Sequence, residues 1–354
     1  MAYLQNEYPM RRIVFILTML FSMSLFALEK VQFPESFADG WEPYVGKMVQ
    51  ITTPLYVCGN YYDSLILAPE RLYVPEERAT GLAEGDSTNY WAIKQANRAQ
   101  IIRLTCNIRN YEVRTGAILK NITARVVAPG KLITGATPKF LNNRPEPKPK
   151  MPKGLLVCAT NIQNYFFDLG GYAHQKTTQE QQDIQTEKIS KALTHINADI
   201  YALVEIQTGQ GALAELAADL TKNTGRNFTY INDGTSTNGS FTKAGYVYCS
   251  DAVTPYRSMR SNDTKYSNRK KAQAFTETAS GEKFILSVNH FKAKSGTASG
   301  TNADQGDGQG KFNADRIVEA ESVLSNYTTY ANYYSEKDML IVGDLNAYGK
   351  EDPI

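Results

Sequence analysis

Apolar residues along the chain recur in short runs separated by polar turns, and the spacing of these runs changes near position 150. Before that position, strand-length apolar runs occupy residues 48–52, 54–58, 64–67, 101–104 and 122–127. Short strands that follow one another at close spacing are typical of a small barrel or sandwich. The pattern predicts a β-rich domain over residues 28–140. It does not distinguish an oligonucleotide-binding barrel from a purely structural module.

After position 150, strand-like runs alternate with helical patterns. The predicted strands are residues 155–160, 200–206, 245–249, 272–277, 284–289 and 339–343. Apolar residues at helical spacing predict three helices, marked by Ile184, Ile189, Ala192, Leu193 and Ile196, then by Leu213, Leu216 and Leu220, and then by Ile317, Val318, Val323, Leu324, Tyr327 and Tyr330. The first of these helices spans residues 179–196. Alternation of this kind predicts an α/β domain in which helices cover sheets.

A proline-rich segment separates the two regions. Residues 142–154 hold four prolines among alternating charges, a composition that favours extended, semi-rigid backbone and cannot enter the middle of a sheet. We therefore expect an interdomain linker over residues 141–153, between a β-rich domain (28–140) and an α/β domain (154–354).

The first 27 residues have the pattern of an export signal. Arg11 and Arg12 precede an apolar run at residues 13–27, and no charge follows until Glu29. A basic pair, an apolar run of this length and a small residue before a polar stretch describe a secretory signal peptide. A membrane anchor needs about 20 apolar residues. We therefore expect a protein exported to the periplasm, the cell surface or the medium.

Composition excludes two classes of protein. Apolar residues make up 42% of the chain, which excludes a mainly disordered protein, and a net charge of +2 excludes a polycation that binds phosphate by bulk charge. An exported protein could pair its four cysteines, with Cys58 and Cys106 cross-linking the first domain. The cysteines lie too far apart in sequence for a cysteine metal motif.

Polar side chains follow four of the predicted strands, where α/β domains place their chemistry. Asn161 and Glu205 end the first two strands of the α/β region, His290 ends a later one, and Asp344 and Asn346 follow the last. Each alone has an ordinary explanation as a rim or turn residue. Together, two carboxylates, two amides and an imidazole are suited to a divalent cation and a phosphate group. Mg²⁺ or Mn²⁺ is expected, because zinc would require more histidine or cysteine.

These residues lie in motifs that resemble those of the endonuclease/exonuclease/phosphatase superfamily, which has the DNase I-like fold. The motifs are Asn161 after a strand, Leu-Val-Glu205-Ile, Val-Asn-His290-Phe-Lys and Val-Gly-Asp344-Leu-Asn346-Ala. The likeness is closer to the secreted bacterial branch of extracellular nucleases, whose signature resembles residues 304–310 with Asn313 to Arg316, and residues 343–354. That branch commonly has a β-barrel domain before the catalytic one. The resemblance covers about residues 154–354.

The resemblance implies a four-layer α/β sandwich and a role for each site residue. Glu205 is the main ligand of the divalent metal, with Asn161 beside it. His290 contacts the scissile phosphate, while Asp344 and Asn346 orient metal, phosphate or water. Arg269 matches the place of a phosphate-contacting arginine, although residues 269–271 equally fit a solvated basic loop. The glycine-rich run 304–310 could hold Ca²⁺, but its spacing differs from an EF-hand and a surface loop is the better interpretation.

The sequence departs from the family pattern after Asn346. The family has a further Asp and a late Asp-His pair there, the His being the water-activating base. Neither His174 nor His195 is placed to replace it, and Tyr248-Cys249-Ser250 stands where Tyr-Arg-Pro is expected. We therefore expect a catalytic domain truncated at its C-terminus, incomplete in its second sheet and weak or inactive.

Three functions remain open at this level. The leading hypothesis is an exported metal-dependent phosphodiesterase acting on nucleic acid, with DNA favoured over RNA. The second is a phosphoesterase of the same fold acting on a lipid or sugar phosphate, because a fold does not fix a substrate. The third is a non-catalytic remnant that binds nucleic acid in a salt-dependent way.

Overall fold

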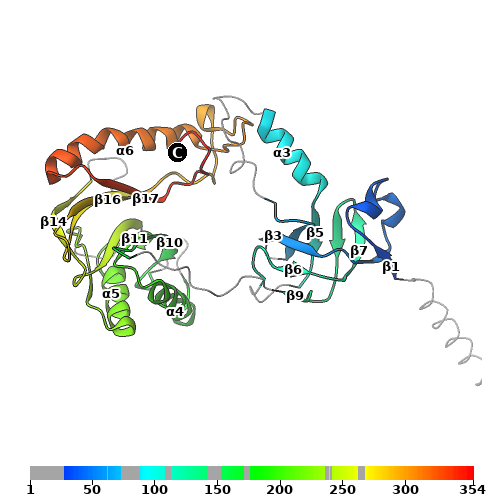
Figure 1. Cartoon of the computed structure of the whole chain (residues 1–354), viewed down its shortest axis with the longest axis horizontal. Helices are drawn as coiled ribbons and strands as arrows, with labels where there is room; N and C mark the ends of the chain where they lie inside the picture. The colour runs from blue at the N-terminus through cyan, green and yellow to red at the C-terminus, as the bar shows by residue number, and fades with distance from the viewer. Residues whose placement is uncertain are drawn as a thin grey trace, which may run out of the picture. The chain divides into compact units, whose positions relative to one another are not determined.

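The computed structural model describes residues 28–61, 63–72, 88–107, 113–141, 153–170, 176–235, 239, 241–261 and 268–354. These residues form two compact units, one made of the described residues up to position 141 and the other of those from position 153 onward. Each unit is described by itself below, with the element labels of Figure 1. The expected signal peptide (1–27) lies outside the described residues, as does the expected linker (141–153) apart from its two ends.

The first unit is a single nine-stranded sheet around one apolar core. Its strands are β1 (Glu29–Val31), β2 (Met48–Ile51), β3 (Leu55–Tyr61), β4 (Ser64–Ala68), β5 (Ile102–Thr105), β6 (Ile118–Leu119), β7 (Ile122–Ala128), β8 (Lys131–Ile133) and β9 (Phe140–Leu141), in the order β1-β2-β7-β8-β5-β4-β3-β6-β9. Val49, Val57, Leu65 and Leu104 are fully buried in the core. The five predicted strands are confirmed.

Helical segments also belong to this unit, and the sequence pattern did not predict them. They are η1 (Glu35–Phe37), η2 (Glu42–Tyr44) and the helix α3 (Thr88–Ala99). Phe37 stacks on Trp41 with ring centroids 3.9 Å apart. The two 3-10 turns therefore bring aromatic side chains to the β-sheet core.

The second unit contains two four-stranded sheets and three helices. One sheet has the order β10-β11-β13-β12 and the other β14-β15-β16-β17. Their strands are β10 (Val157–Tyr165), β11 (Ile200–Gln207), β12 (Phe228–Tyr230), β13 (Thr242–Cys249), β14 (Val253–Arg260), β15 (Lys270–Glu277), β16 (Lys283–His290) and β17 (Met339–Asp344). The helices are α4 (Gln179–Ile196), α5 (Gly211–Thr224) and α6 (Asn313–Tyr334), with a 3-10 turn, η3 (Gly300–Asn302), before α6.

Three apolar layers hold these elements together as helix, sheet, sheet and helix (Figure 1). Leu213 and Leu216 of α5 pack with Leu203 of β11 on the outer face of the first sheet. Val204 of β11 and Leu286 of β16 meet between the two sheets. Below α6, a third cluster covers the outer face of the second sheet. The predicted fold class, a four-layer α/β sandwich after a small β domain, is confirmed.

The strand β11 shows why these sequences form buried strands. Up to Val204, its odd-numbered side chains, such as Tyr201 and Leu203, face the helices, and its even-numbered ones, such as Ala202 and Val204, face the other sheet. A strand covered on both faces reads as a continuous apolar run. The run is interrupted at the half-buried Glu205, and the buried Ile206 after it packs in the cluster on the helix side.

The buried faces of two helices differ from the predicted stripes. In α4, Ile184 and Ile196 are exposed, whereas Gln182 is buried because its side chain bonds the backbone of Phe166. In α6 the buried face differs more strongly from the predicted apolar stripe. Val318 and Leu324 are exposed, and the buried face consists of Arg316, Glu319, Val323, Tyr330 and Tyr334. Long-range polar contacts therefore set this face.

All four cysteines are free thiols, so the possible cross-link between Cys58 and Cys106 is not formed in the structure. The Cys58 thiol instead accepts a hydrogen bond from the backbone of Leu72, and Cys106 is buried in the core. Among the described residues, no helix has the length and apolar character that a membrane span requires.

Candidate active site

The candidate site lies where strands of the two sheets in the second unit approach each other. Asn161 is in β10 and Glu205 near the end of β11, while His290 and Asp344 are the last residues of β16 and β17. The parallel pairing of β16 with β17 sets His290 beside Asp344. Strands β10 and β11 contact β17 across the sandwich. Four side chains that are distant in sequence are thereby brought to one place.

Local irregularities in the first sheet aim two of these side chains. The register of β10 against β11 shifts between Asn161 and Tyr165, and β11 shifts against β13 between Leu203 and Ile206. Glu205 lies within the second shift with a φ of 62°. A non-glycine residue in this left-handed region carries backbone strain, which clusters at functional sites. The bulge turns the Glu205 side chain out of the alternating pattern of β11.

Asn161 holds two carboxylates together. Its Nδ2 donates to Glu205 Oε1 at 2.7 Å and to Asp344 Oδ2 at 3.0 Å. The backbone N–H groups of Gln163 and Asn164 complete the arrangement, donating to Asn161 Oδ1 at 2.8 Å and to Glu205 Oε2 at 2.9 Å. One neutral amide therefore orients two negative charges without neutralising them. Two carboxylates held this close repel each other, and a cation bound between them would offset that repulsion.

His290 completes a set of ligand atoms that fits a cation. Its Nε2 lies 3.7 Å from Glu205 Oε1, and one ligand atom from each of Glu205, His290 and Asp344 lies within 4.8 Å of the others. Two ligands on opposite sides of a divalent cation are roughly 4–5 Å apart. The two carboxylates, with an imidazole beside them, thus match the size and the charge that such an ion requires.

Burial and charge determine the protonation of His290. Desolvation lowers the pKa of the imidazole below its usual value and the Arg269 guanidinium lowers it further, although Asp344 and Glu205 oppose the shift. The imidazole is therefore neutral at neutral pH. A neutral ring has one N–H donor and one lone pair, so it can hold a proton at one nitrogen and accept at the other.

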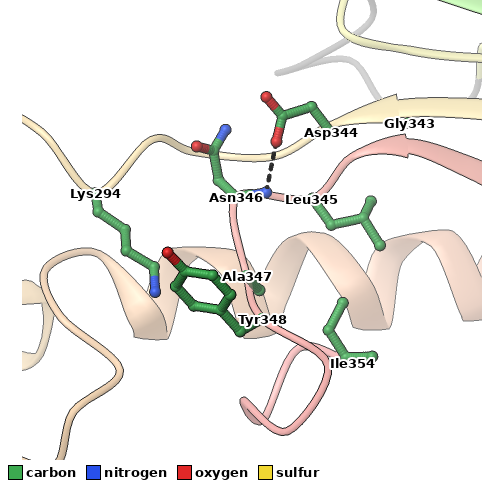
Figure 2. A pocket seen from close by; sticks show the side chains of 8 residues that line it. All are labelled: Lys294, Gly343, Asp344, Leu345, Asn346, Ala347, Tyr348 and Ile354. Carbon is green, nitrogen blue, oxygen red and sulfur yellow. Dashed lines mark hydrogen bonds between the residues drawn. The ribbon is translucent and has the colours of Figure 1, made fainter. Parts of the chain in front are cut away.

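Asn346 and Arg269 hold the chain that follows His290. Asn346 Nδ2 donates to the carbonyl of Phe291 at 3.0 Å, and its backbone N–H donates to Asp344 Oδ1 at 3.0 Å, which Figure 2 shows as a dashed line. The Arg269 guanidinium donates to the same Phe291 carbonyl. The Arg269 carbonyl accepts from the backbone N–H of His290 at 2.9 Å. In the structure both side chains therefore fix the position of the His290 strand end.

Glu319 is a further residue of this region that the sequence analysis did not identify. It is fully buried on α6, and its Oε2 accepts from the backbone N–H of Lys292 at 2.6 Å. Its Oε1 lies 3.9 Å from Arg269 Nη1. Burial raises the pKa of this carboxyl, and the bond from Lys292 opposes that shift. A charged residue within an apolar helical pattern was the available signal, since such residues are rarely buried without a partner.

The glycine-rich run 304–310 forms a closed loop against α6. The Asp304 and Asp307 carboxylates accept backbone N–H groups of their own loop, from Gly306 and Gln309. The fully buried Arg316 donates to the carbonyls of Gln309 at 2.9 Å and Lys311 at 2.8 Å. Arg316 thus holds the end of the loop against α6, which explains why the sequence motif includes both residues 304–310 and Arg316. Binding of Ca²⁺ by the loop stays a prediction.

The two remaining histidines are not part of this arrangement. His195 lies in the last turn of α4 and lines a separate groove between α4 and α5, and His174 lies outside the described residues. Tyr248 is buried between the sheets, where its ring packs on Phe275. Within the described part of the chain, the ligand-type histidine beside the two carboxylates is His290.

Gly343 allows β17 to lie against β16 at the site. Its φ is 134°, and a Cβ at this position would come within 1.8 Å of the Asn289 carbonyl oxygen. Only glycine fits this backbone and this approach. The glycine of the Gly-Asp-Leu-Asn motif therefore has a structural role, which is to set Asp344 beside His290.

Comparison with known proteins gives distant likenesses only. No protein-family model matches the chain, and no curated protein matches it. Similar solved structures include an endonuclease/exonuclease/phosphatase family protein from Bacteroides thetaiotaomicron, with 13% identity and a TM-score of 0.35 over 54% of this chain and 63% of that chain. The human Nocturnin catalytic domain with bound sulfate has 16% identity and a TM-score of 0.38 over 56% of this chain and 67% of that one. A mannosyl-6-phosphatase from Bacteroides thetaiotaomicron has 14% identity and a TM-score of 0.38 over 56% and 69%.

These solved structures match this chain only over part of its length and with low structural similarity. The chain spans 63% of the length of the first of these proteins, and all three TM-scores are below 0.5. The fold class of this chain is defined by its own sheet order and layers, which form the α/β sandwich described above.

Proposed function

We propose that this chain is an exported, divalent-metal-dependent phosphodiesterase of the endonuclease/exonuclease/phosphatase type that hydrolyses nucleic acid, with DNA preferred over RNA. One observation carries the proposal: Glu205, His290 and Asp344, from three strands in two sheets, place their ligand atoms within 4.8 Å of one another. Carboxylate and imidazole groups at strand ends are suited to cation-assisted phosphoryl chemistry.

The metal would be held by Glu205 and Asp344 with His290 beside them. Mg²⁺ or Mn²⁺ suits the oxygen-rich ligands, and when bound it supplies charge neutralisation for the phosphate and an acidified water. Asn161 keeps both carboxylates in position through its two hydrogen bonds. This preorganisation lowers the cost of assembling the site when substrate arrives.

His290 supplies the contact with the phosphate. Its side chain is 15% exposed, so one edge of the ring remains accessible. As a neutral imidazole it offers an N–H to a non-bridging phosphate oxygen, and this bond strengthens as negative charge develops there. Arg269, which lowers the pKa of the imidazole, adds positive charge on the same side.

Hydrolysis of a small diester tests the proposal without assuming a natural substrate. We expect the purified chain to hydrolyse bis(4-nitrophenyl) phosphate and plasmid DNA only slowly with Mg²⁺ or Mn²⁺, because a weak catalyst is expected without the family's water-activating His, and to lose this activity in EDTA. Glu205→Ala and His290→Ala should each abolish it. His195→Ala is the matched control, because this histidine lies outside the site, and it should retain activity.

The other outcomes distinguish the competing functions. If Glu205→Ala and His290→Ala both keep the activity of the unmodified chain, the assignment of the active site is wrong. Hydrolysis of a lipid or sugar phosphate without action on DNA would replace the substrate class. Salt-dependent DNA binding without turnover would indicate a binding protein. Export is tested separately, by fractionating cells that express the chain with a C-terminal tag and asking whether residues 1–27 are removed.

A further inference from the structure

A cavity of about 510 Å³ is lined by Asp344, one of the candidate metal ligands. Asp344 and Asn346 lie at one part of its wall, and Lys294 and Tyr348 at another, as Figure 2 shows. Leu345 and Ile354 add apolar surface. The volume lies in the range of small-molecule sites, roughly 300–1,000 Å³. The cavity therefore adjoins the candidate site at Asp344 and extends from there into a region of different chemistry.

Lys294 and Tyr348 form a cationic and aromatic pair in this region. The Lys294 ammonium lies 4.9 Å from the centroid of the Tyr348 ring, within the distance of a cation–π contact. Lys294 also forms an ion pair with the buried carboxylate of Glu351. These contacts hold the lysine in place, so its charge is fixed at the edge of the cavity. The Tyr348 residue is 40% exposed, which leaves ring surface for a ligand.

We propose that this cavity is a nucleotide subsite, in which the Tyr348 ring stacks on a base next to the phosphate held at the metal ligands. Lys294, held by its ion pair with Glu351, keeps ammonium N–H groups that can donate to the phosphate of that nucleotide. The inference rests on the proposed function and extends it, because it assigns the substrate class to a second set of residues. Proteins that bind single-stranded nucleic acid combine aromatic stacking surfaces with cations along the backbone in this way.

The order of residues along one short segment supports the assignment. Asp344 is the last residue of β17, and Asn346 and Tyr348 follow it at alternate positions, so the candidate metal ligand and the ring belong to the same short segment of chain. A small phosphate monoester would fill the Asp344 end and make no contact with the Tyr348 ring. A polynucleotide presents a phosphate and a flat base together, which matches both ends of the cavity.

Binding of short oligonucleotides tests the subsite. The chain would carry His290→Ala so that the substrate stays intact, and fluorescence anisotropy in Mg²⁺ would give the affinity for a labelled single-stranded hexadeoxynucleotide. An abasic hexamer with the same phosphates is the comparison ligand. The variants are Tyr348→Leu, which removes the ring, and Tyr348→Phe, which keeps it as the matched control.

Tyr348→Leu should weaken binding of the base-containing oligonucleotide about tenfold, or about 1.4 kcal/mol, within the range for removing an aromatic ring beneath one base. It should change abasic binding by much less, and Tyr348→Phe should weaken binding less than Tyr348→Leu. Equal losses for the two ligands would overturn the proposal. So would no loss, or a Phe variant as weak as the Leu variant.

A second measurement avoids substitution at Tyr348 altogether. Adenosine 5′-monophosphate should displace the labelled oligonucleotide at a concentration about tenfold lower than ribose 5-phosphate, and equal potency would overturn the subsite. Hydrolysis of bis(4-nitrophenyl) phosphate by the unmodified chain reports the proposed function independently. A ring effect without hydrolysis contradicts only the function, and hydrolysis without a ring effect contradicts only the subsite.

Discussion

Removing the Glu319 side chain tests whether α6 positions the strand end that carries His290. Glu319 is fully buried, accepts the Lys292 N–H at 2.6 Å, and lies 3.9 Å from the Arg269 guanidinium. Lys292 is two residues after His290, and Arg269 holds the Phe291 carbonyl between them. A change at residue 319 therefore acts on His290 through the chain that follows it, and we regard Glu319 as a positioning residue.

The structure sets the size of the effect. Glu319→Ala leaves the half-buried Lys292 N–H without its acceptor, at a cost of about 1–2 kcal/mol. It also removes the carboxylate 3.9 Å from the Arg269 guanidinium, but that side chain is 26% exposed, so the pair contributes less than a fully buried one and we expect about 2–3 kcal/mol in total. Glu319→Gln keeps an acceptor oxygen and loses only the charge, so we expect about 1–2 kcal/mol. Glu321→Ala is the matched control on the exposed side of α6, with an expected change below about 0.5 kcal/mol.

Urea unfolding must be followed by far-UV circular dichroism, because both tryptophans, Trp41 and Trp91, lie in the first unit. On bis(4-nitrophenyl) phosphate, kcat should fall about 10- to 100-fold in Glu319→Ala with little change in KM, since a displacement of about 1 Å costs this much. Glu319→Gln should recover part of the loss. If Glu319→Ala unfolds like the Glu321→Ala control and keeps its kcat, the positioning argument is wrong.

Three further changes have expected outcomes. Gly343→Ala, whose Cβ would meet the Asn289 carbonyl at 1.8 Å, should destabilise the second unit by more than about 4 kcal/mol in urea unfolding, whereas Gly349→Ala, in open space, should be nearly neutral. Glu205→Gly should be about 1 kcal/mol more stable than Glu205→Ala and should melt at a higher temperature, because the φ of 62° strains alanine. Equal melting temperatures of the two variants would contradict the backbone strain. Burial raises the pKa of Cys106 from 9.0 to about 11. The unfolded thiol therefore ionises first, and stability followed by tryptophan fluorescence should fall above about pH 9, less so in Cys106→Ala.

Much of the fold is visible in the sequence because local signals agree with long-range packing. The helix predicted over residues 179–196 has those bounds as α4, with the Thr178 hydroxyl accepting the Gln181 N–H at its start and Asn197 in a left-handed conformation at its end. Strands buried on both faces, such as β11, read as unbroken apolar runs. These signals do not depend on which neighbour covers the strand.

The elements that the sequence did not predict have weak apolar patterns. Strand β14 is an edge strand with mostly exposed side chains, including Pro255 and Arg257, and edge strands often carry such residues. In α6 the buried Arg316 and Glu319 bond backbone groups of the 309–311 loop and of Lys292. Partners so far away in the sequence leave no local pattern to detect.

The candidate site could be predicted only in part for a similar reason. Polar residues at strand ends identified Asn161, Glu205, His290 and Asp344, which the structure brings together. The sequence does not show that Asn346 and Arg269 bond the Phe291 carbonyl in this conformation, since their contacts depend on the fold of a third segment. Their roles toward phosphate and water stay predictions.

Binding of Mn²⁺ tests most directly whether strand ends of two sheets form one cation site. Electron paramagnetic resonance titration of the full chain should show one bound Mn²⁺ that Mg²⁺ displaces. Glu205→Gln, in one sheet, and Asp344→Asn, in the other, should each weaken that site at least tenfold, while Asp219→Asn on the α4–α5 groove should not. Undiminished Mn²⁺ affinity in both site variants would contradict the account.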